Sequence, residues 1–133
     1  MGKTYDKLAL MYFKDGKVLI TKKRGRSVFY QPGGKREGNE TDEQALIREI
    51  REELSVEIIP ETIRPYGVFE AHADSEPEDV MVHMTCYFTE FTGELKSGTE
   101  EKEFAWLGMD DLDKISKIGL LIFADAHEKG LLK

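Results

Sequence analysis

The sequence predicts a layered α/β domain, in which a mixed β-sheet packs against helices. Two observations predict this class. Short β-type segments separated by turn residues recur over most of the chain, and two longer segments, one in the middle and one near the C-terminal end, carry helix signals. The chain has 133 residues, of which 40% are hydrophobic and 34% charged, which suffices for one core. We therefore expect a single domain over residues 1–133.

The first predicted strands form a hairpin. Residues 7–13 (KLALMYF) and 18–23 (VLITKK) have strand character, and the Asp-Gly pair between them is a strong hairpin-turn signal. Residues 28–30 (VFY) predict a short strand that ends at Pro32. The two glycines that follow the proline permit backbone angles that other residues resist.

A helix is predicted over residues 41–54. Thr41 and Gln44 form a capping-box pattern at its start, and a β-branched stretch closed by Pro60 follows its end. One stripe of the helix is apolar and can pack on the sheet. This stripe consists of Leu46, Ile47, Ile50 and Leu54.

The second half of the chain predicts three more strands and a second helix. The strands cover residues 67–73, 80–91 and 104–109, and most of residues 110–130 form the helix. Both faces of segment 80–91 (VMVHMTCYFTEF) are largely apolar, so we expect this strand in the centre of the sheet. The polar residues 92–103 predict a loop.

Charge and cysteine content narrow the possible functions. A net charge of −7 argues against a nucleic-acid polymer as partner, because phosphate backbones bind basic patches. A small phosphate ligand is compatible with this charge if a divalent metal reverses the local field. Cys86 is the only cysteine, which excludes an intrachain disulfide and favours a cytoplasmic location. No apolar stretch approaches a membrane span in length, so we expect no membrane partner.

Carboxylates gather on the middle helix. Glu49, Glu52 and Glu53 are spaced i, i+3 and i+4, so they share one face, where like charges repel one another. We expect Arg48 and Arg51 on the flank of this face. A hard divalent cation, which prefers oxygen ligands, would remove the repulsion. The alternative is an ordinary solvated acidic helix.

The wider spacing of residues 34–56 resembles the Nudix box, the signature of the Nudix hydrolases. The positions that match the family's offsets are Gly34, Glu40, Arg48, Glu49, Ile50, Glu52, Glu53 and Val56. Ser55 stands where the family has glycine, at a helix exit where a left-handed cap is common. The segments "LITKK", "PGG" and "EEKEFAWL" also resemble the family's flanking regions. The resemblance implies the Nudix fold, a mixed sheet sandwiched between helices (α/β/α).

The resemblance also implies a reaction and a cofactor. Nudix hydrolases cleave a nucleoside diphosphate linked to another group, with Mg²⁺, or Mn²⁺ as a substitute, on the pyrophosphate. The implied metal ligands are Glu49, Glu52, Glu53 and the carbonyl group of Gly33. Gly34 belongs to the motif, and Glu40 and Arg48 would form a structural pair that holds the preceding loop on the helix.

Three carboxylates are candidates for the chemical step. Glu52 and Glu53 lie on the predicted helix. Glu100 lies on the loop before the last strand, where many relatives have a glutamate that binds metal or acts as the general base. Glu101 and Glu103 are near rivals for the same role. The alternative for all three loop residues is a solvated acidic segment.

The resemblance is closest to small MutT-like enzymes, because no signature of a longer substrate appears. It implies hydrolysis of a (deoxy)nucleoside triphosphate, with oxidised purine nucleotides included, to NMP and pyrophosphate. The alternatives are ADP-ribose, a nucleotide sugar, a dinucleoside polyphosphate, or a non-catalytic module that binds a nucleotide. For the oligomeric state, the sequence is compatible with a monomer and with a homodimer. The candidate substrate contacts are Lys23, Arg24, Phe29, Tyr5 and Phe123, although the aromatic side chains are also typical of a core.

Overall fold

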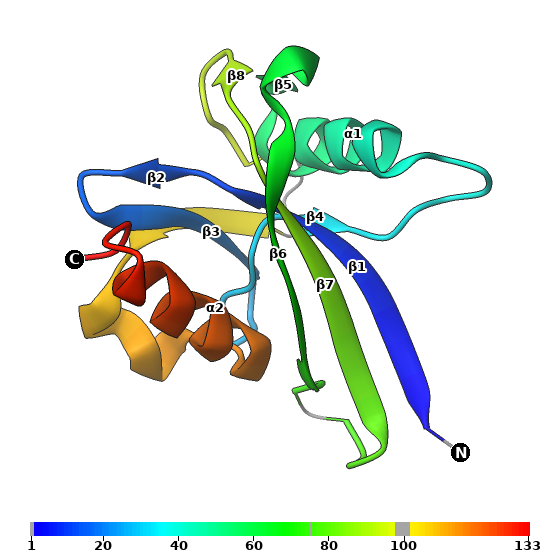
Figure 1. Cartoon of the computed structure of the whole chain (residues 1–133), viewed down its shortest axis with the longest axis vertical. Helices are drawn as coiled ribbons and strands as arrows, with labels where there is room; N and C mark the ends of the chain where they lie inside the picture. The colour runs from blue at the N-terminus through cyan, green and yellow to red at the C-terminus, as the bar shows by residue number, and fades with distance from the viewer. Residues whose placement is uncertain (1, 75, 98–101) are drawn as a thin grey trace.

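The computed structural model of the chain describes residues 2–74, 76–97 and 102–133. Figure 1 shows strands that cross the middle of the molecule, with α1 (Asp42–Leu54) and α2 (Lys117–Glu128) on different sides of them. The described strands are β1 (Lys3–Met11), β2 (Phe13–Lys14), β3 (Lys17–Lys23), β4 (Gly33–Gly34), β5 (Glu57–Ile58), β6 (Arg64–His72), β7 (Val80–Phe88), β8 (Phe91–Thr92) and β9 (Lys102–Leu107).

The central sheet is mixed, as predicted. Its strand order is β4-β1-β7-β6, in which β1 runs parallel to β7 while β4 and β6 are antiparallel to their neighbours. The β1–β7 register runs from Lys3 opposite Val80 to Met11 opposite Phe88. Strand β7, which the sequence predicts to be central, therefore has a partner on both sides. Strands β2, β3 and β9 form a second sheet, and β5 pairs with β8.

Alternate residues of β1 enter two cores on opposite faces of the sheet. Ala9 and Met11 pack in the core that includes α2, whereas Leu8 and Leu10 pack in the core that includes α1. All four residues are at most 1% exposed. Strand β3 alternates in the same way between the two cores. Burial on both faces confirms the α/β/α sandwich.

Local signals in the sequence explain the ends of the main elements. The Thr41 hydroxyl accepts from the Gln44 N–H at 3.1 Å, and the Gln44 side chain accepts from the Thr41 N–H at 2.9 Å, which confirms the capping box. Ser55 closes α1 in the left-handed region, with φ 61° and ψ 28°. Asp15 and Gly16 have φ of 53° and 78°, as a two-residue hairpin turn requires.

The segment predicted as a short strand, residues 28–30, needs correction. It makes only single bridges, one between Phe29 and Ile115 and one between Tyr30 and Thr21. Because these adjacent residues bridge to different parts of the chain, no continuous ladder forms. The segment instead spans the gap between β3 and the glycine turn.

The helix predicted over residues 110–130 is divided. A 3₁₀ segment, Met109–Lys114, precedes α2, and the Ser116 hydroxyl caps α2 by accepting from the Gly119 N–H at 3.1 Å. The serine therefore starts a new helix where continuous helical periodicity was expected. Within the described ranges, neither helix is long and apolar enough to cross a membrane.

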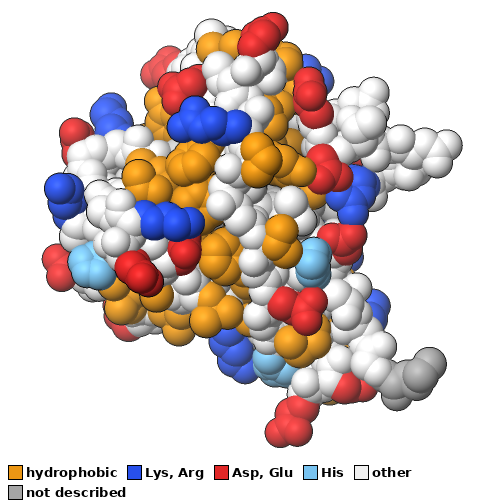
Figure 2. All heavy atoms as spheres, in the orientation of Figure 1, with side chains coloured by type: hydrophobic (Ala, Val, Ile, Leu, Met, Phe, Trp, Pro, Cys, Tyr) orange, Lys and Arg blue, Asp and Glu red, His pale blue; other side chains and the backbone are white. Residues whose placement is uncertain are grey.

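The face turned to the viewer in Figure 2 carries an apolar strip over β6 and beside α2, with charged side chains around it. The exposed large apolar side chains of these two elements are Val68 on β6, and Leu120 and Leu121 on α2. The predicted carboxylates lie on α1.

Candidate functional site

Two glycines bring the loop before α1 close to the helix and to the sheet. A β-carbon on Gly34 would lie 1.7 Å from Glu49 Oε2, and one on Gly33 would lie 2.0 Å from the carbonyl oxygen of Leu8. Gly33 also has a φ of +147°, which side chains rarely allow. The Pro-Gly-Gly turn therefore places backbone directly beside the carboxylates of α1.

Glu53 is the buried carboxylate of the site. The residue is 7% exposed, and the Gly33 N–H donates to Oε1 at 3.2 Å. Burial raises the pKa of Glu53 to about 7, although the Lys102 ammonium, 3.7 Å from Oε2, and the Gly33 hydrogen bond both lower it. A bound cation would stabilise the ionised form of such a group, because burial otherwise disfavours it.

Arg48 connects the carboxylates of the motif. Its Nε and Nη2 donate to Glu40 at 2.8 and 2.9 Å, so the pair implied by the Nudix box is present. These bonds lower the pKa of Glu40 to about 2. Nη1 also donates to Glu49 at 2.5 Å and to Glu52 at 2.8 Å. From its place on the flank, the long side chain of Arg48 thus reaches into the acidic face, which helical spacing alone did not predict.

The carboxylates are not gathered into a ready metal site. In the part of the chain that the structure describes, no three Asp, Glu, His or Cys side chains converge as such a site. Glu49 and Glu52 each accept from Arg48 through Oε1, and Glu53 turns to Gly33. The donor set nevertheless fits Mg²⁺ or Mn²⁺, since three carboxylates on one helix supply the oxygen ligands that these ions prefer. The Oε2 atoms of Glu49 and Glu52 are not used by Arg48.

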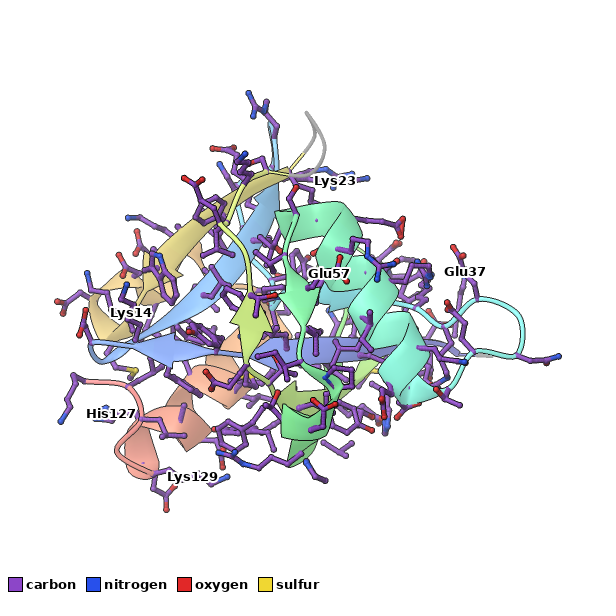
Figure 3. All side chains as sticks on the ribbon, turned by 90° about the horizontal axis from the view of Figure 1, so that it is seen from above. Lys14, Lys23, Glu37, Glu57, His127 and Lys129 are labelled. Carbon is purple, nitrogen blue, oxygen red and sulfur yellow. The ribbon has the colours of Figure 1, made fainter. Side chains whose placement is uncertain are left out.

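A cavity of about 260 Å³ opens beside Glu53. Its wall carries four cationic side chains, Lys7, Lys23, Arg26 and Lys102, and Glu53 is the one carboxylate among its described lining residues. Figure 3 shows Lys23 near the C-terminal end of α1, in agreement with its place in this wall. In a chain whose net charge is −7, this local surplus of positive charge suits a phosphate-bearing ligand.

The predicted substrate contacts lie in different parts of the structure. Lys23 lines the cavity, and Tyr5 lines an adjoining hollow. Arg24 is exposed, and Phe29 is partly buried against the core. Phe123 is 0% exposed, so its assignment as a substrate contact is wrong. The side chain lies on the inner face of α2, where it fills the core.

The loop carboxylates are only partly described. Glu100 and Glu101 lie outside the described residues, so the predictions for them stay predictions. Glu103 lies on β9, and its carboxylate pairs with Lys22 of β3 at 3.5 Å. It therefore already has a cationic partner, and it is not among the lining residues of the cavity.

Sequence reasoning missed three of the four cavity cations: Lys7, Arg26 and Lys102. They come from β1, from the loop after β3 and from β9, so no spacing along the chain connects them. The one available signal was Lys102, a single cation in the acidic run "EEKE".

Most of the chain matches one known protein family. The model described as NUDIX domain matches residues 7–125. The chain belongs to the NUDIX family. The Nudix box implied by the sequence thus lies inside the matched region, and its glycines and carboxylates form the site described above.

Individual members of the family share about a third or less of their residues with this chain. An ADP-ribose pyrophosphatase of Methanocaldococcus jannaschii is 32% identical over 106 residues, which cover 77% of this chain and 61% of that protein. A CTP pyrophosphohydrolase of Escherichia coli is 27% identical over 114 residues, covering 82% and 79%. The chain spans less than two thirds of the length of the first curated relatives it matches.

A solved structure shows the same fold. The crystal structure of a MutT NUDIX hydrolase from Burkholderia pseudomallei superposes with a TM-score of 0.75 at 22% identity. The superposition covers 92% of this chain and 97% of that one. The mixed sheet between helices is therefore the Nudix fold.

Proposed function

We propose that this Nudix protein is a divalent-metal-dependent hydrolase of small nucleotides, which cleaves a phosphoanhydride bond in a nucleoside diphosphate linked to another group. The observation that carries the proposal is the buried carboxylate of Glu53 in the wall of a cavity that also carries four cations. Carboxylates suit the metal, and the cations suit the phosphate oxygens that the metal does not bind.

The carboxylates of α1 would hold the metal. Glu49, Glu52 and Glu53 are the proposed ligands, with the Gly33 carbonyl as a further one. When bound, Mg²⁺ or Mn²⁺ polarises phosphoryl oxygens and lowers the pKa of a coordinated water. Until then, Arg48 offsets the repulsion between Glu49 and Glu52 by donating to both.

The proposed substrate is a (deoxy)nucleoside triphosphate, with oxidised purine nucleotides included, and the products are NMP and pyrophosphate. The name of the E. coli relative, a CTP pyrophosphohydrolase, supports this class. ADP-ribose is the second candidate, because the M. jannaschii relative is named for it. The single cysteine, which is buried, is consistent with the cytoplasm as the proposed location.

A nucleotide panel tests this function. Formation of NMP and pyrophosphate would be measured for the common (deoxy)nucleoside triphosphates and an oxidised purine triphosphate, and formation of AMP for ADP-ribose, first with magnesium and then with chelator. We expect magnesium-dependent pyrophosphate release from at least one triphosphate. Turnover of ADP-ribose alone would contradict the substrate class, and the absence of any turnover would contradict the hydrolase.

The proposed general base is Glu100. A carboxylate near a bound cation stays ionised and can take a proton from the attacking water. We expect Glu100→Gln to lower kcat at least about a hundredfold with little change in KM. Glu103→Gln is the matched control, because Glu103 already pairs with Lys22. If Glu100→Gln, Glu101→Gln and Glu103→Gln all stayed within a few fold of the parent, the base would have to be a helix glutamate such as Glu52 or Glu53.

A further inference from the structure

Lys7 is a partly buried lysine in the middle of strand β1. Among the described residues it forms no salt bridge, whereas Lys102 in the same cavity wall contacts Glu53. The contact recorded for its ammonium is aromatic: Nζ lies 5.6 Å from the centre of the Tyr30 ring. A charge held inside the protein in this way lacks the compensation that an ion pair would give.

The charges around Lys7 favour the arrival of an anion. Burial lowers the pKa of Lys7, and the ammonium groups of Lys35 and Lys102 lower it further, against the opposite effect of Glu53 and Glu49. Two neighbouring cations thus repel the Lys7 ammonium. An anionic ligand at this point would be attracted to all three.

Lys7 also lies where two hollows meet. It lines both the cavity of about 260 Å³ beside Glu53 and an adjoining hollow of about 240 Å³. Tyr30 is shared by the two in the same way, and the second hollow is also lined by Lys35 and by the carboxylates of Asp74 and Glu76, so Lys7 and Lys35 are its cationic part. A ligand that extends from Glu53 toward the second hollow therefore passes Lys7.

We propose that Lys7 is a specificity-determining residue that selects for the terminal phosphate of a nucleoside triphosphate. This inference rests on the proposed function and adds a physical basis for its substrate class. A terminal phosphate carries roughly −1.5 to −2 charges, more than a phosphate inside a diphosphate diester such as ADP-ribose. A partly buried ammonium that has no ion-pair partner among the described residues is attracted most strongly to that extra charge.

The other cavity cations are less suited to this role. Lys23 and Arg26 are exposed, so water screens their charges and their side chains must be ordered on binding. Lys102 already contacts Glu53 at 3.7 Å. Lys7 combines partial burial with a rigid strand, which strengthens its interaction with a charge and fixes its position.

The test compares Lys7→Met, Lys7→Arg and Lys14→Met. Lys14 is an exposed lysine on β2, Figure 3 shows it well away from Lys23, and it is not among the residues that line the cavity. The first readout is kcat/KM with magnesium for the best nucleoside triphosphate and for ADP-ribose. The second readout is calorimetric binding of inorganic triphosphate and of pyrophosphate in the presence of chelator, which needs no turnover.

We expect Lys7→Met to lower kcat/KM for the triphosphate at least about tenfold, mainly through KM, and to change ADP-ribose turnover less than about threefold. It should weaken binding of inorganic triphosphate more than binding of pyrophosphate. Lys7→Arg should retain most of the triphosphate turnover and most of the inorganic triphosphate binding, and Lys14→Met should match the parent in both.

Equal losses on both nucleotides, or unchanged binding of inorganic triphosphate, would overturn the role of Lys7. The binding arm separates this outcome from failure of the proposed function. If the parent hydrolysed no nucleotide but Lys7→Met still lost triphosphate binding, the hydrolase proposal would fail and the Lys7 site would stand.

Discussion

At the scale of single residues, Glu53 combines an unfavourable burial of its carboxyl group with the proposed chemical role. Its carboxyl group is buried on α1 and has one backbone hydrogen bond and one ammonium, Lys102, close by. Its pKa is raised from 4.5 to about 7 because burial outweighs these partners. The folded protein therefore binds this proton more tightly than the unfolded chain does.

The sign of the pH dependence follows from that difference. Glu53 favours folding fully below its unfolded pKa, and this contribution is lost as the pH rises through about 7. In chelator, we expect the stability of Glu53→Gln relative to the parent to rise by about 3 kcal/mol between pH 4.5 and 8. Urea unfolding of both proteins at several pH values measures this difference in stability. The exposed Glu61→Gln is the control, and a difference independent of pH would contradict the burial argument.

Gln31 is a second residue with an unfavourable buried group. It is 4% exposed, and neither its Nε2 nor its Oε1 has a hydrogen-bond partner among the described residues. Replacing an unpartnered buried amide by an apolar side chain of similar shape removes its desolvation penalty, which is about 1–3 kcal/mol. We expect Gln31→Met to raise the free energy of unfolding by roughly 1 kcal/mol or more in urea titrations.

A companion variant checks the reasoning for Gln31. The hydroxyl of Thr89 is also buried and has no hydrogen-bond partner in the described part of the chain, and it lies in a different hollow of the molecule. Thr89→Val should stabilise in the same direction. If both variants were less stable than the parent, the two buried groups must have hydrogen-bond partners in solution, such as bound water molecules, and the prediction would be wrong.

At the scale of elements, α1 is set by signals at both of its ends. The capping box at Thr41 and Gln44 starts it, and Ser55 ends it with a φ of 61°. A non-glycine residue is strained in this region by roughly 1–2 kcal/mol. The helix therefore presents its carboxylates despite a suboptimal C-cap.

Ser55→Gly tests this interpretation of the helix end. We expect it to raise the free energy of unfolding by up to about 1 kcal/mol, because glycine adopts positive φ without a β-carbon clash. Ser27→Gly is the matched control, since Ser27 is exposed and is not among the positive-φ residues. An unchanged denaturation midpoint for Ser55→Gly, with the control also unchanged, would show that the left-handed cap carries little strain.

Elements with local signals were predictable from the sequence, and others were not. The hairpin turn at Asp15 and α1 depend on neighbours a few residues away, so both were predicted correctly. The division of residues 110–130 depends on the Ser116 cap, which competes with a continuous apolar pattern. The reach of Arg48 into the acidic face depends on side-chain conformation, which helical spacing alone does not specify.

At the scale of the whole molecule, the sandwich assembles a site from distant parts of the chain. The glycine turn is held against β1, and α1 packs on the same face through Leu8 and Leu10. Lys7 of β1 and Lys102 of β9 reach the cavity beside Glu53 from two different sheets. The carboxylates were predictable because they share one helix, whereas the cations meet only in the folded chain.

The central claim is that the α1 carboxylates bind a divalent metal for phosphoanhydride hydrolysis. The most direct test is turnover of the best nucleotide as a function of magnesium concentration, for the parent and for Glu53→Gln, with circular dichroism to verify the fold. We expect turnover in the parent to require magnesium and to saturate with it, and Glu53→Gln to lose at least about a hundredfold at ordinary magnesium while staying folded. Near-native turnover by Glu53→Gln, or full activity of the parent in chelator, would contradict the claim.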